Sequence, residues 1–364
     1  SRTGNIVGGH QRFKILVAMG YEEVDCVVLD IDEQKEKALN VALNKISGAF
    51  DIPLLTDLLK DIGASGFDVS LTGFDAAEMD ALFKDSVVAG IREDDFDEPL
   101  PEAPLSMQGD IWLLGRHRLI CGDATKPETY KHLMDGKQAN LVVTDPPYNV
   151  DYKGTAGRLK NDNMESAKFY DFLLGAYRCM YDVLVDGGSI YVFHADRETV
   201  NFRMAFSEAG FFCHQTCIWI KNTPVLGRCD YQYTHEPVLM GWKPTAGHSW
   251  YADRKQRTTW NFDRPTKSKY HPTMKPVALC AYPIVNSSLT NGIVLDPFGG
   301  SGSTLMACEQ TGRICHIIEL DERYADVIVK RYIEYKGSHD GVTLLRTGKA
   351  LLFAELINER AVDG

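Results

Sequence analysis

Between residues 118 and 335 the chain alternates short apolar runs with longer stretches of helical periodicity, and no other feature constrains its fold as strongly. Apolar runs of strand length lie at Arg118–Cys121, Asn140–Thr144, Gly188–His194, Cys213–Lys221, Pro237–Trp242, Gly292–Asp296 and Ile314–Leu320. The helical stretches are Ala167–Val185, Glu198–Ala209, Pro276–Ser288, Ser303–Thr311 and Glu322–Tyr335. Strands that alternate with helices build a mainly parallel sheet with helices on both faces. The sequence therefore predicts an α/β fold with a doubly wound sheet.

Residues 92–104 interrupt this pattern with acidic side chains and three prolines. A segment of that composition is typical of a linker and is expected to bury no apolar surface. Upstream of it we predict helices at Arg12–Gly20, Gln34–Lys45 and Pro53–Ile62, and a strand at Val24–Asp30. The expected organisation is a small, partial α+β domain at 1–91, a linker at 92–109, a main domain at 110–345 and a C-terminal tail at 346–364.

The negative charge of the chain is concentrated in its first third. Positions 1–109 hold 21 acidic and 9 basic side chains, a balance of −12, whereas positions 110–364 hold 29 and 30. The acidity of the whole chain therefore does not argue against contact between the main domain and nucleic acid. Nine cysteines form no CxxC pair, and no apolar run is long enough to span a bilayer. We expect a cytoplasmic protein in a reducing compartment, with no membrane partner.

One predicted strand ends in a carboxylate, two prolines and an aromatic ring, in the order Asp145-Pro146-Pro147-Tyr148. Prolines stiffen the backbone and remove N–H donors, which leaves hydrogen-bond acceptors beside a stacking surface. The exocyclic amine of a nucleobase needs such a site, because Asp145 and the Pro146 carbonyl can accept its two N–H groups while Tyr148 lies against the ring. A tight turn with Tyr148 in the core is the structural alternative.

A second predicted strand ends in a glycine-rich loop, Asp296–Gly302, that leads into a helix. Loops of this kind bring bare backbone against a ligand, as dinucleotide-binding loops do. Glu319 ends the next strand, 17 residues after Gly302, where an acid can bind ribose hydroxyls. Because both strand ends would flank the switch point of a doubly wound sheet, we expect the two loops to share one pocket.

Together with His271-Pro272-Thr273-Met274-Lys275-Pro276, these two motifs resemble those of S-adenosylmethionine-dependent DNA amino-methyltransferases. The catalytic motif precedes the cofactor motif, as it does in the beta class, which contains mostly adenine-N6 enzymes. The resemblance covers about residues 108–336 and implies a Rossmann-like methyltransferase sheet with a permuted motif order. It further implies site-specific transfer of a methyl group from S-adenosylmethionine to the N6 amine of adenine in double-stranded DNA.

The resemblance also assigns roles residue by residue. It implies catalytic roles for Asp145, Pro146, Pro147 and Tyr148. It implies cofactor contacts for Asp123, Thr273, Lys275, Asp296, Phe298, Gly300, Gly302 and Glu319. Among these, Asp123 would meet the adenine amine of the cofactor and Glu319 its ribose, while Thr273 and Lys275 would grip its methionine carboxylate. Ile317 stands where relatives often carry glycine, and we expect it to narrow the space near the ribose.

Two basic stretches are candidates for DNA contact. One is the candidate target-recognition segment 243–270, where basic and aromatic side chains interleave, and the other directly follows the catalytic motif. Basic side chains neutralise phosphates and can read base edges. A solvated basic loop whose aromatic rings pack inward is the structural alternative. The candidate DNA-contacting residues are Lys153, Arg158, Lys160, Arg254, Lys255, Arg257, Arg264, Lys267 and Lys269.

Near the start of the chain, Gly8-Gly9-His10-Gln11-Arg12 and the helix that follows resemble the ParB/sulfiredoxin-like domain. The strands expected before this motif would lie upstream of residue 1, so we expect a partial domain that serves as a folding scaffold or docking module. Elsewhere, Cys213, His214 and Cys217 lie in a strand-like run whose side chains alternate between faces, so we expect buried thiols and no metal site.

Two alternative functions stay open on the sequence. A cytosine N4 amine would present the same N–H donors to Asp145 as an adenine N6 amine does. A non-catalytic ParB-like adaptor that binds DNA or nucleotides would keep the fold without the reaction. The resemblance also leaves open a homodimer and a cognate restriction nuclease as partners.

Overall fold

The structure is a computed structural model that divides into two compact units, residues 1–85 and 86–364. No helix within its described residues is long and apolar enough to cross a membrane. The described residues are 3–47, 50, 52–64, 68–75, 77–82, 90–151, 153–154, 157–158, 160–225, 229–264 and 274–357.

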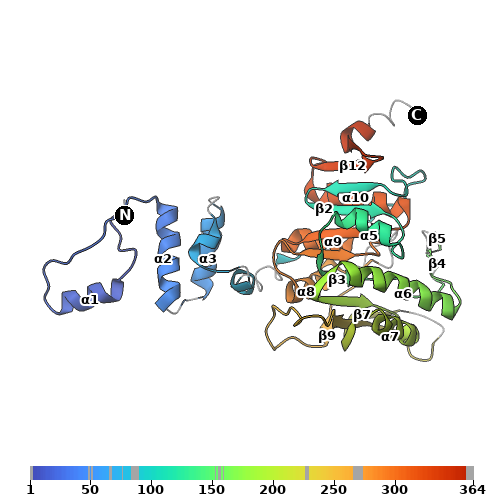
Figure 1. Cartoon of the computed structure of the whole chain (residues 1–364), viewed down its shortest axis with the longest axis horizontal. Coiled ribbons are helices and arrows are strands. Elements are labelled where there is room, and N and C mark those ends of the chain that lie inside the picture. Colours follow the sequence, from blue (N-terminus) through green and yellow to red (C-terminus); the bar gives the residue numbers. More distant parts are fainter. Residues whose placement is uncertain are drawn as a thin grey trace. The chain divides into compact units, whose positions relative to one another are not determined.

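The larger unit is built around one mixed sheet, in which eleven strands are described (Figure 1). From one edge to the other they are β13 (Lys349–Leu352), β12 (Val342–Arg346), β1 (Ile111–Leu114), β2 (His117–Cys121), β11 (Ile314–Glu319), β10 (Ile293–Asp296), β3 (Ala139–Thr144), β6 (Leu184–Phe193), β8 (Tyr233–Trp242), β7 (Phe212–Val225) and β9 (Thr259–Asn261). The central strands from β2 to β6 are parallel, and antiparallel pairs extend the sheet on both sides. A separate pair, β4 (Lys153–Gly154) and β5 (Gly157–Arg158), follows β3 in the chain.

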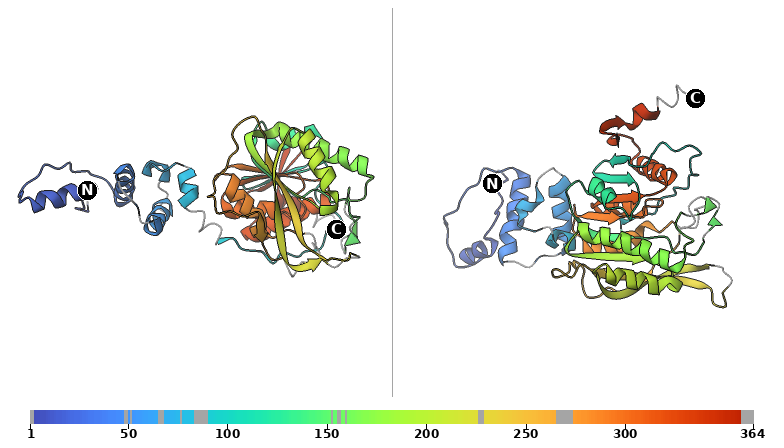
Figure 2. Two further views of the ribbon diagram at one scale, coloured as in Figure 1. Left: turned by 90° about the horizontal axis from the view of Figure 1, so that it is seen from below. Right: turned by 45° about the vertical axis from the view of Figure 1, so that its right-hand side comes forward.

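Helices cover both faces of the sheet. Successive side chains of a strand point to opposite faces, so each face carries its own hydrophobic core beneath the helices. One face carries α5 (Pro127–Met134), α6 (Ser166–Val183) and, after a 3-10 turn at Asp196–Glu198, α7 (Thr199–Glu208). The other face carries α8 (Val277–Ser287), α9 (Ser303–Thr311) and α10 (Glu322–Lys336). Within β3, Val142 packs under the first set of helices, whereas Leu141 and Val143 pack under the second. Figure 2 shows the twisted strands between green and orange helices.

The predicted α/β architecture is confirmed. All seven strands and five helices predicted between 118 and 335 are present, with ends shifted by at most four residues. The two strands that carry the motifs, β3 and β10, are parallel neighbours in which Val294 pairs with Leu141. The sequence did not predict α5 or the strands β1, β9, β12 and β13. Because β13 pairs with β12 inside the sheet, the prediction of a tail from residue 346 is wrong over Lys349–Leu352.

The predicted linker packs against the larger unit. Phe96 is only 4% exposed, so the expectation that this segment buries no apolar surface is wrong. The physical reason lies in its acidic residues, which find partners on the folded unit. Asp94 forms an ion pair with Arg331 of α10, and the backbone N–H groups of Leu105 and Ser106 donate to Asp326 on the same helix.

The described part of the smaller unit is helical. Its elements are α1 (His10–Ala18), α2 (Glu33–Ser47), α3 (Ile52–Ala64) and a short 3-10 helix at Val69–Thr72. A small core joins α2 to α3, and its buried members are Ala38, Val41, Leu55, Leu59 and Ile62. The predicted strand at Val24–Asp30 is wrong: these residues form no ladder, and Val27 and Val28 are exposed. A strand needs a neighbour for its backbone groups, and the described residues supply none here.

Candidate active site

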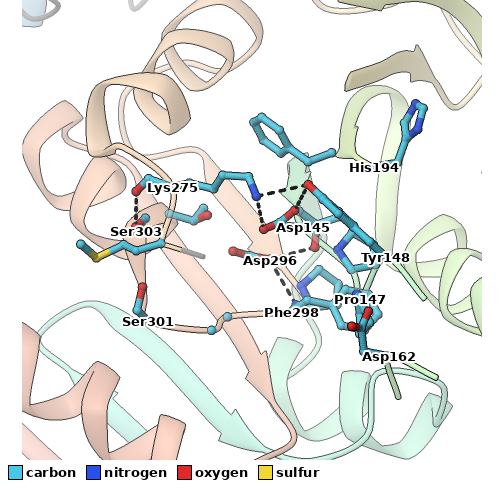
Figure 3. A pocket seen from close by; sticks show the side chains of 18 of the residues that line it. Asp145, Pro147, Tyr148, Asp162, His194, Lys275, Asp296, Phe298, Ser301 and Ser303 are labelled. Carbon is cyan, nitrogen blue, oxygen red and sulfur yellow. Dashed lines mark hydrogen bonds and ion pairs between the residues drawn. The ribbon is translucent and has the colours of Figure 1, made fainter. Parts of the chain in front are cut away.

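A cavity of about 570 Å³ opens at the carboxyl ends of β3 and β10. The chain leaves β3 toward α6 on one face of the sheet and leaves β10 toward α9 on the other, so this is the switch point of the sheet. Residues 145–148 line the cavity from β3, and residues 296–301 line it from β10 (Figure 3). The structure therefore brings the two loops to one pocket, as expected.

Within this pocket the hydroxyl group of Tyr148 contacts the carboxylate of Asp145. The hydroxyl oxygen is 2.6 Å from Oδ1 of Asp145 and 2.9 Å from Oε2 of Glu236, which extends from β8. A phenol has one proton to donate, so two carboxylates face a single donor. The ring itself packs against the cores on both faces of the sheet. The tyrosine is thus held by both its hydroxyl and its ring.

Lys275 supplies the missing positive charge. Its ammonium nitrogen lies 2.5 Å from Oδ2 of Asp145, 3.2 Å from the Tyr148 hydroxyl and 3.3 Å from Oε2 of Glu236 (Figure 3). Lys221 of β7 approaches the other oxygen of Glu236 at 2.5 Å. Two ammonium groups and two carboxylates therefore balance within one cluster. The resemblance predicted that Lys275 grips the cofactor carboxylate, whereas the structure places its ammonium on Asp145.

Burial and charge act in opposite directions on this cluster. Burial raises the pKa of Asp145, and the adjacent Lys275 ammonium partly offsets that rise. Burial alone would also raise the pKa of Glu236, but Lys275 and Lys221 outweigh it and hold that pKa at about 2. Burial would lower the pKa of Lys275, yet Asp145 and Glu236 outweigh it and raise the pKa instead. Lys275 and Glu236 are therefore charged at neutral pH.

The glycine-rich loop presents bare backbone to the cavity. Gly300 has φ +51°, and a Cβ atom built on it would meet nothing within 4 Å. Asp296 holds the base of the loop, since its Oδ1 accepts hydrogen bonds from the Thr144 hydroxyl at 2.8 Å and the Phe298 backbone N–H at 3.2 Å. Burial raises the pKa of Asp296 to about 7. Gly302, with φ +85°, stands at the N-cap of α9.

Two further acids lie around the loop. Glu319 accepts the Gly300 N–H at 2.7 Å with one oxygen and the Asp321 N–H at 2.8 Å with the other. Burial raises the pKa of Glu319 to about 7. Asp123, after β2, also lines the cavity and accepts two hydrogen bonds from Thr125. Both acids line the cavity, and their contacts with a cofactor stay a prediction.

The prediction that Ile317 narrows this region is wrong. Its side chain is fully buried and is not part of the cavity wall. It lies beneath Gly299, where an added Cβ would come within 2.5 Å of Cγ2 of Ile317. The isoleucine therefore packs under the loop and leaves the ligand side open.

The described candidate DNA-contacting residues differ in their surroundings. Arg254, Lys255 and Arg257 are exposed in the segment before β9, whereas Arg264 lines the cavity. Trp260 is buried, as the structural alternative expects of the aromatic rings, whereas Trp250 in the same segment is exposed. Lys160 lies 3.6 Å from the carboxylates of Asp321 and Glu322 at the cavity. Outside the described residues lie Thr273, Lys267 and Lys269, together with the side chains of Lys153 and Arg158.

Glu236 and Lys221 are the functional candidates that the sequence interpretation missed. The His235-Glu236 pair resembles one found in the family, but the sequence gives it no role. Lys221 gave a clearer signal, because it lies two residues after the buried Trp219 on a strand and so points to the same face. A lysine on a buried face needs a partner. Among the described residues, no group of histidine, cysteine and acidic side chains could hold a metal ion.

Comparison with known proteins finds both family models and relatives that match the chain. A family model described as DNA methylase matches residues 139–330, more than half of the chain, and one described as ParB-methyltransferase HTH domain matches residues 53–108. The chain is 27% identical over 238 residues to the type II methyltransferase M.HpaI of Haemophilus parainfluenzae, covering 59% of this chain and 73% of that protein. It is 30% identical over 208 residues to YubD of Escherichia coli (strain K12), covering 57% and 86%. The crystal structure of an M1.HpyAVI–SAM complex aligns with a TM-score of 0.46 and 25% identity, over 58% of this chain and 98% of that one.

The family match begins at β3 and ends within α10. It therefore contains the acceptor cluster, the glycine-rich loop and Glu319. The family that the three motifs indicated is confirmed: the chain belongs to the DNA methylase family.

Proposed function

We propose that this protein transfers a methyl group from S-adenosylmethionine to the N6 amine of adenine at specific sites in double-stranded DNA. The family is that of DNA methyltransferases that use this cofactor; the target atom and the residue roles are the proposal. The observation that carries it is the single cavity in which the Asp145 cluster lies beside the bare loop at Gly300.

The residues around the loop fit the cofactor. A cavity of about 570 Å³ is in the range of small-molecule sites. Glu319 uses one lone pair on each oxygen for the backbone of the loop and its neighbour, so two acceptor positions remain for a pair of ribose hydroxyls. Asp123 is assigned to the adenine amine, and Phe298 and Gly300 to the cofactor's close contacts. When bound, the cofactor supplies an electrophilic methyl group on a positively charged sulfur.

The Asp145 cluster is suited to hold an exocyclic amine. Lys275 holds one oxygen of Asp145 and Tyr148 the other, and each oxygen keeps a second lone pair for an incoming N–H group. The carbonyl of Pro146 offers the other acceptor. Fixed acceptors of this kind orient the amine before it reacts and require no rearrangement during the reaction. As the amine nitrogen bonds to the methyl carbon, the bond from that carbon to sulfur breaks and leaves its electron pair on the sulfur. The amine then loses a proton, and Asp145 is the base that we assign to accept it.

The cavity admits a base but not a duplex, so the target base leaves the helix before it reacts. Arg254, Lys255 and Arg257 are exposed, and we assign them to the phosphates that flank the extruded base. The smaller unit is a poor candidate for phosphate contact, because positions 1–85 hold 15 acidic and only 8 basic side chains. We favour an enzyme over a non-catalytic adaptor, because the chain belongs to the methylase family.

The DNA substrate and the cysteines indicate where in the cell the protein acts. We place the protein in the cytoplasm, where DNA is accessible and cysteines stay reduced; all nine cysteines are free thiols. A homodimer and a cognate restriction nuclease remain predictions.

The proposal is tested by mass spectrometry of nucleosides from unmethylated, mixed-sequence DNA incubated with the protein and S-adenosylmethionine. N6-methyladenine is the expected product. N4-methylcytosine would keep the reaction and overturn the assigned base. If neither product forms on double-stranded DNA, the proposed substrate is wrong.

A further inference from the structure

We infer that Glu93 and Asp94, in the segment that joins the smaller unit to the sheet, are positioning residues that hold Lys275 and the glycine-rich loop in their working geometry. The inference rests on the cofactor site assigned under Proposed function. Both residues lie outside the stretch that matches the methylase family, at 139–330, and inside the stretch that matches the ParB-methyltransferase HTH domain, at 53–108. The segment therefore stabilises a site without lining its cavity.

Asp94 acts through Arg331 of α10, whose side chain is 2% exposed. The two carboxylate oxygens of Asp94 accept hydrogen bonds from Nε and Nη2 of Arg331 at 2.8 and 2.9 Å. The remaining nitrogen, Nη1, donates to the Ser301 carbonyl at 2.9 Å, within the glycine-rich loop. A guanidinium is a planar, rigid fork, so a carboxylate that binds two of its nitrogens also aims the third. Asp94 therefore fixes the donor that holds the cofactor loop.

Glu93 acts on the start of α8. Its two carboxylate oxygens accept the backbone N–H groups of Val277 and Ala278 at 2.8 and 2.9 Å. The first N–H groups of a helix have no partner within the helix, and the N-cap residue here is Pro276, which offers no side-chain cap. Glu93 supplies that cap and a negative charge at the positive end of the helix. It thereby fixes the backbone two residues after Lys275.

Ser303 connects these two supports. Its hydroxyl lies 3.3 Å from Nη1 of Arg331 and donates to the backbone carbonyl of Lys275 at 2.7 Å (Figure 3). The path from Asp94 through Arg331 and Ser303 therefore ends on the residue whose ammonium contacts Asp145. Adjacent acids in the chain thus support the two halves of one cavity: Asp94 supports the loop, and Glu93 supports the backbone of Lys275.

Two nearby acids serve as controls, one in the segment and one on α10. Glu98 lies 3.8 Å from Lys330 of α10 as a surface ion pair. Asp326, also on α10, accepts the N–H groups of Leu105 and Ser106, so it anchors the segment without contacting the loop or Lys275 through these bonds. A variant of Glu98 tests the loss of a negative charge from the segment, and a variant of Asp326 tests the loss of both a negative charge and an anchor of the segment.

The experiment uses the full chain and compares Asp94→Asn, Glu93→Gln, Glu98→Gln and Asp326→Asn. S-adenosylmethionine affinity is measured by calorimetry, KM and kcat by methyl transfer to DNA, and Tm by thermal unfolding. We expect Asp94→Asn to raise Kd and KM for the cofactor about tenfold, with a smaller effect on kcat. We expect Glu93→Gln to lower kcat about three- to tenfold while cofactor Kd stays within about twofold of the wild type. Glu98→Gln should change none of these quantities, and Asp326→Asn should lower Tm alone.

The inference is overturned if Asp94→Asn and Glu93→Gln lower Tm as Asp326→Asn does and leave cofactor Kd and kcat unchanged. If Asp94→Asn does not fold, the kcat and Kd values of Glu93→Gln decide the matter in the same way. A wild-type protein that fails to bind S-adenosylmethionine would instead overturn the cofactor site itself. That outcome is distinguishable, because it appears before any variant is compared.

Discussion

The ammonium nitrogen of Lys275 lies 2.5 Å from Oδ2 of Asp145, and the lysine side chain is 9% exposed. This contact joins a residue two positions before α8 to the carboxylate that follows β3, 130 positions earlier in the chain. A buried carboxylate without a partner would be protonated at neutral pH. The lysine therefore favours the charged, accepting form of Asp145 in the wall of the cavity.

Loss of Lys275 is expected to slow methyl transfer and shift its pH dependence. Burial raises the pKa of Asp145, Glu236 adds to that rise, and Lys275 and the Tyr148 hydroxyl oppose it. In Lys275→Met the pKa of Asp145 rises further, so a larger fraction of the enzyme is protonated and inactive on the acidic side. We expect kcat to fall about a hundredfold and the acidic limb of the pH–rate profile to move to higher pH. Lys330→Met, on the surface of α10, is the control, and an acidic limb that stays in place would contradict the role.

Cofactor affinity is expected to depend on the protonation of Glu319. Burial raises the pKa of this residue to about 7, and only its ionised form offers every oxygen lone pair to ribose hydroxyls. The wild-type Kd for S-adenosylmethionine should therefore rise as the pH falls from about 8 to about 6. Glu319→Gln should bind about tenfold more weakly at the higher pH and lose most of this dependence, although Asp296 titrates in the same range. Calorimetry across the pH range would refute the role if the wild-type Kd proved constant.

Two neighbouring glycines are expected to respond differently to a single added methyl group. In Gly300→Ala the Cβ meets open space, but φ of +51° is unfavourable for alanine. We expect a loss of about 1 kcal/mol in the free energy of unfolding, together with weaker cofactor binding. In Gly299→Ala the Cβ would lie 2.5 Å from Cγ2 of Ile317, and a loss of about 1–3 kcal/mol is expected. Denaturant unfolding measures both variants, and a Gly299→Ala protein as stable as the wild type would contradict the packing described for Ile317.

Removal of three exposed basic side chains is expected to weaken DNA binding but not cofactor binding. A basic side chain that neutralises one phosphate adds about 0.9 to the slope of log K against log salt. The triple variant Arg254→Ala, Lys255→Ala, Arg257→Ala should therefore lower the slope by up to about 3. The matched control is Lys131→Ala with Lys168→Ala, two surface lysines on α5 and α6. Fluorescence anisotropy at several salt concentrations measures both, and an unchanged slope in the triple variant would show that this segment does not bind phosphate.

The parts of the fold that could be predicted depend on local pattern. The buried central strands were visible because their apolar runs are bounded by acids and glycines, and β3 and β10 could be placed side by side from topology alone. By contrast, β13 is a short edge strand that pairs only with β12 among the described strands, and β12 pairs with β13 and β1. Val24–Asp30 has the composition of a strand but lacks a neighbour among the described residues. Strand formation in both cases depends on distant residues that a local window does not contain.

In the candidate site, too, some residues could be predicted from local pattern and others depend on distant parts of the chain. Asp145 and Gly300 stood in contiguous motifs and could be identified by composition. Glu236 and Lys221 take their meaning from charges on other strands, and Glu93 from a helix 184 positions away. Lys275 was identified, but its motif gave no information about which carboxylate its ammonium would contact. Only the folded sheet brings these charges together.

The central claim is that one cavity contains an acceptor cluster for the amine and a separate loop for the cofactor. The most direct test compares the wild type with Asp145→Asn, using Asp171→Asn on the exposed face of α6 as the control. The rate of methyl transfer to DNA at saturating S-adenosylmethionine is measured together with the cofactor Kd. We predict that Asp145→Asn loses transfer by at least about a hundredfold while its Kd stays close to that of the wild type. Retained transfer in this variant would contradict the account.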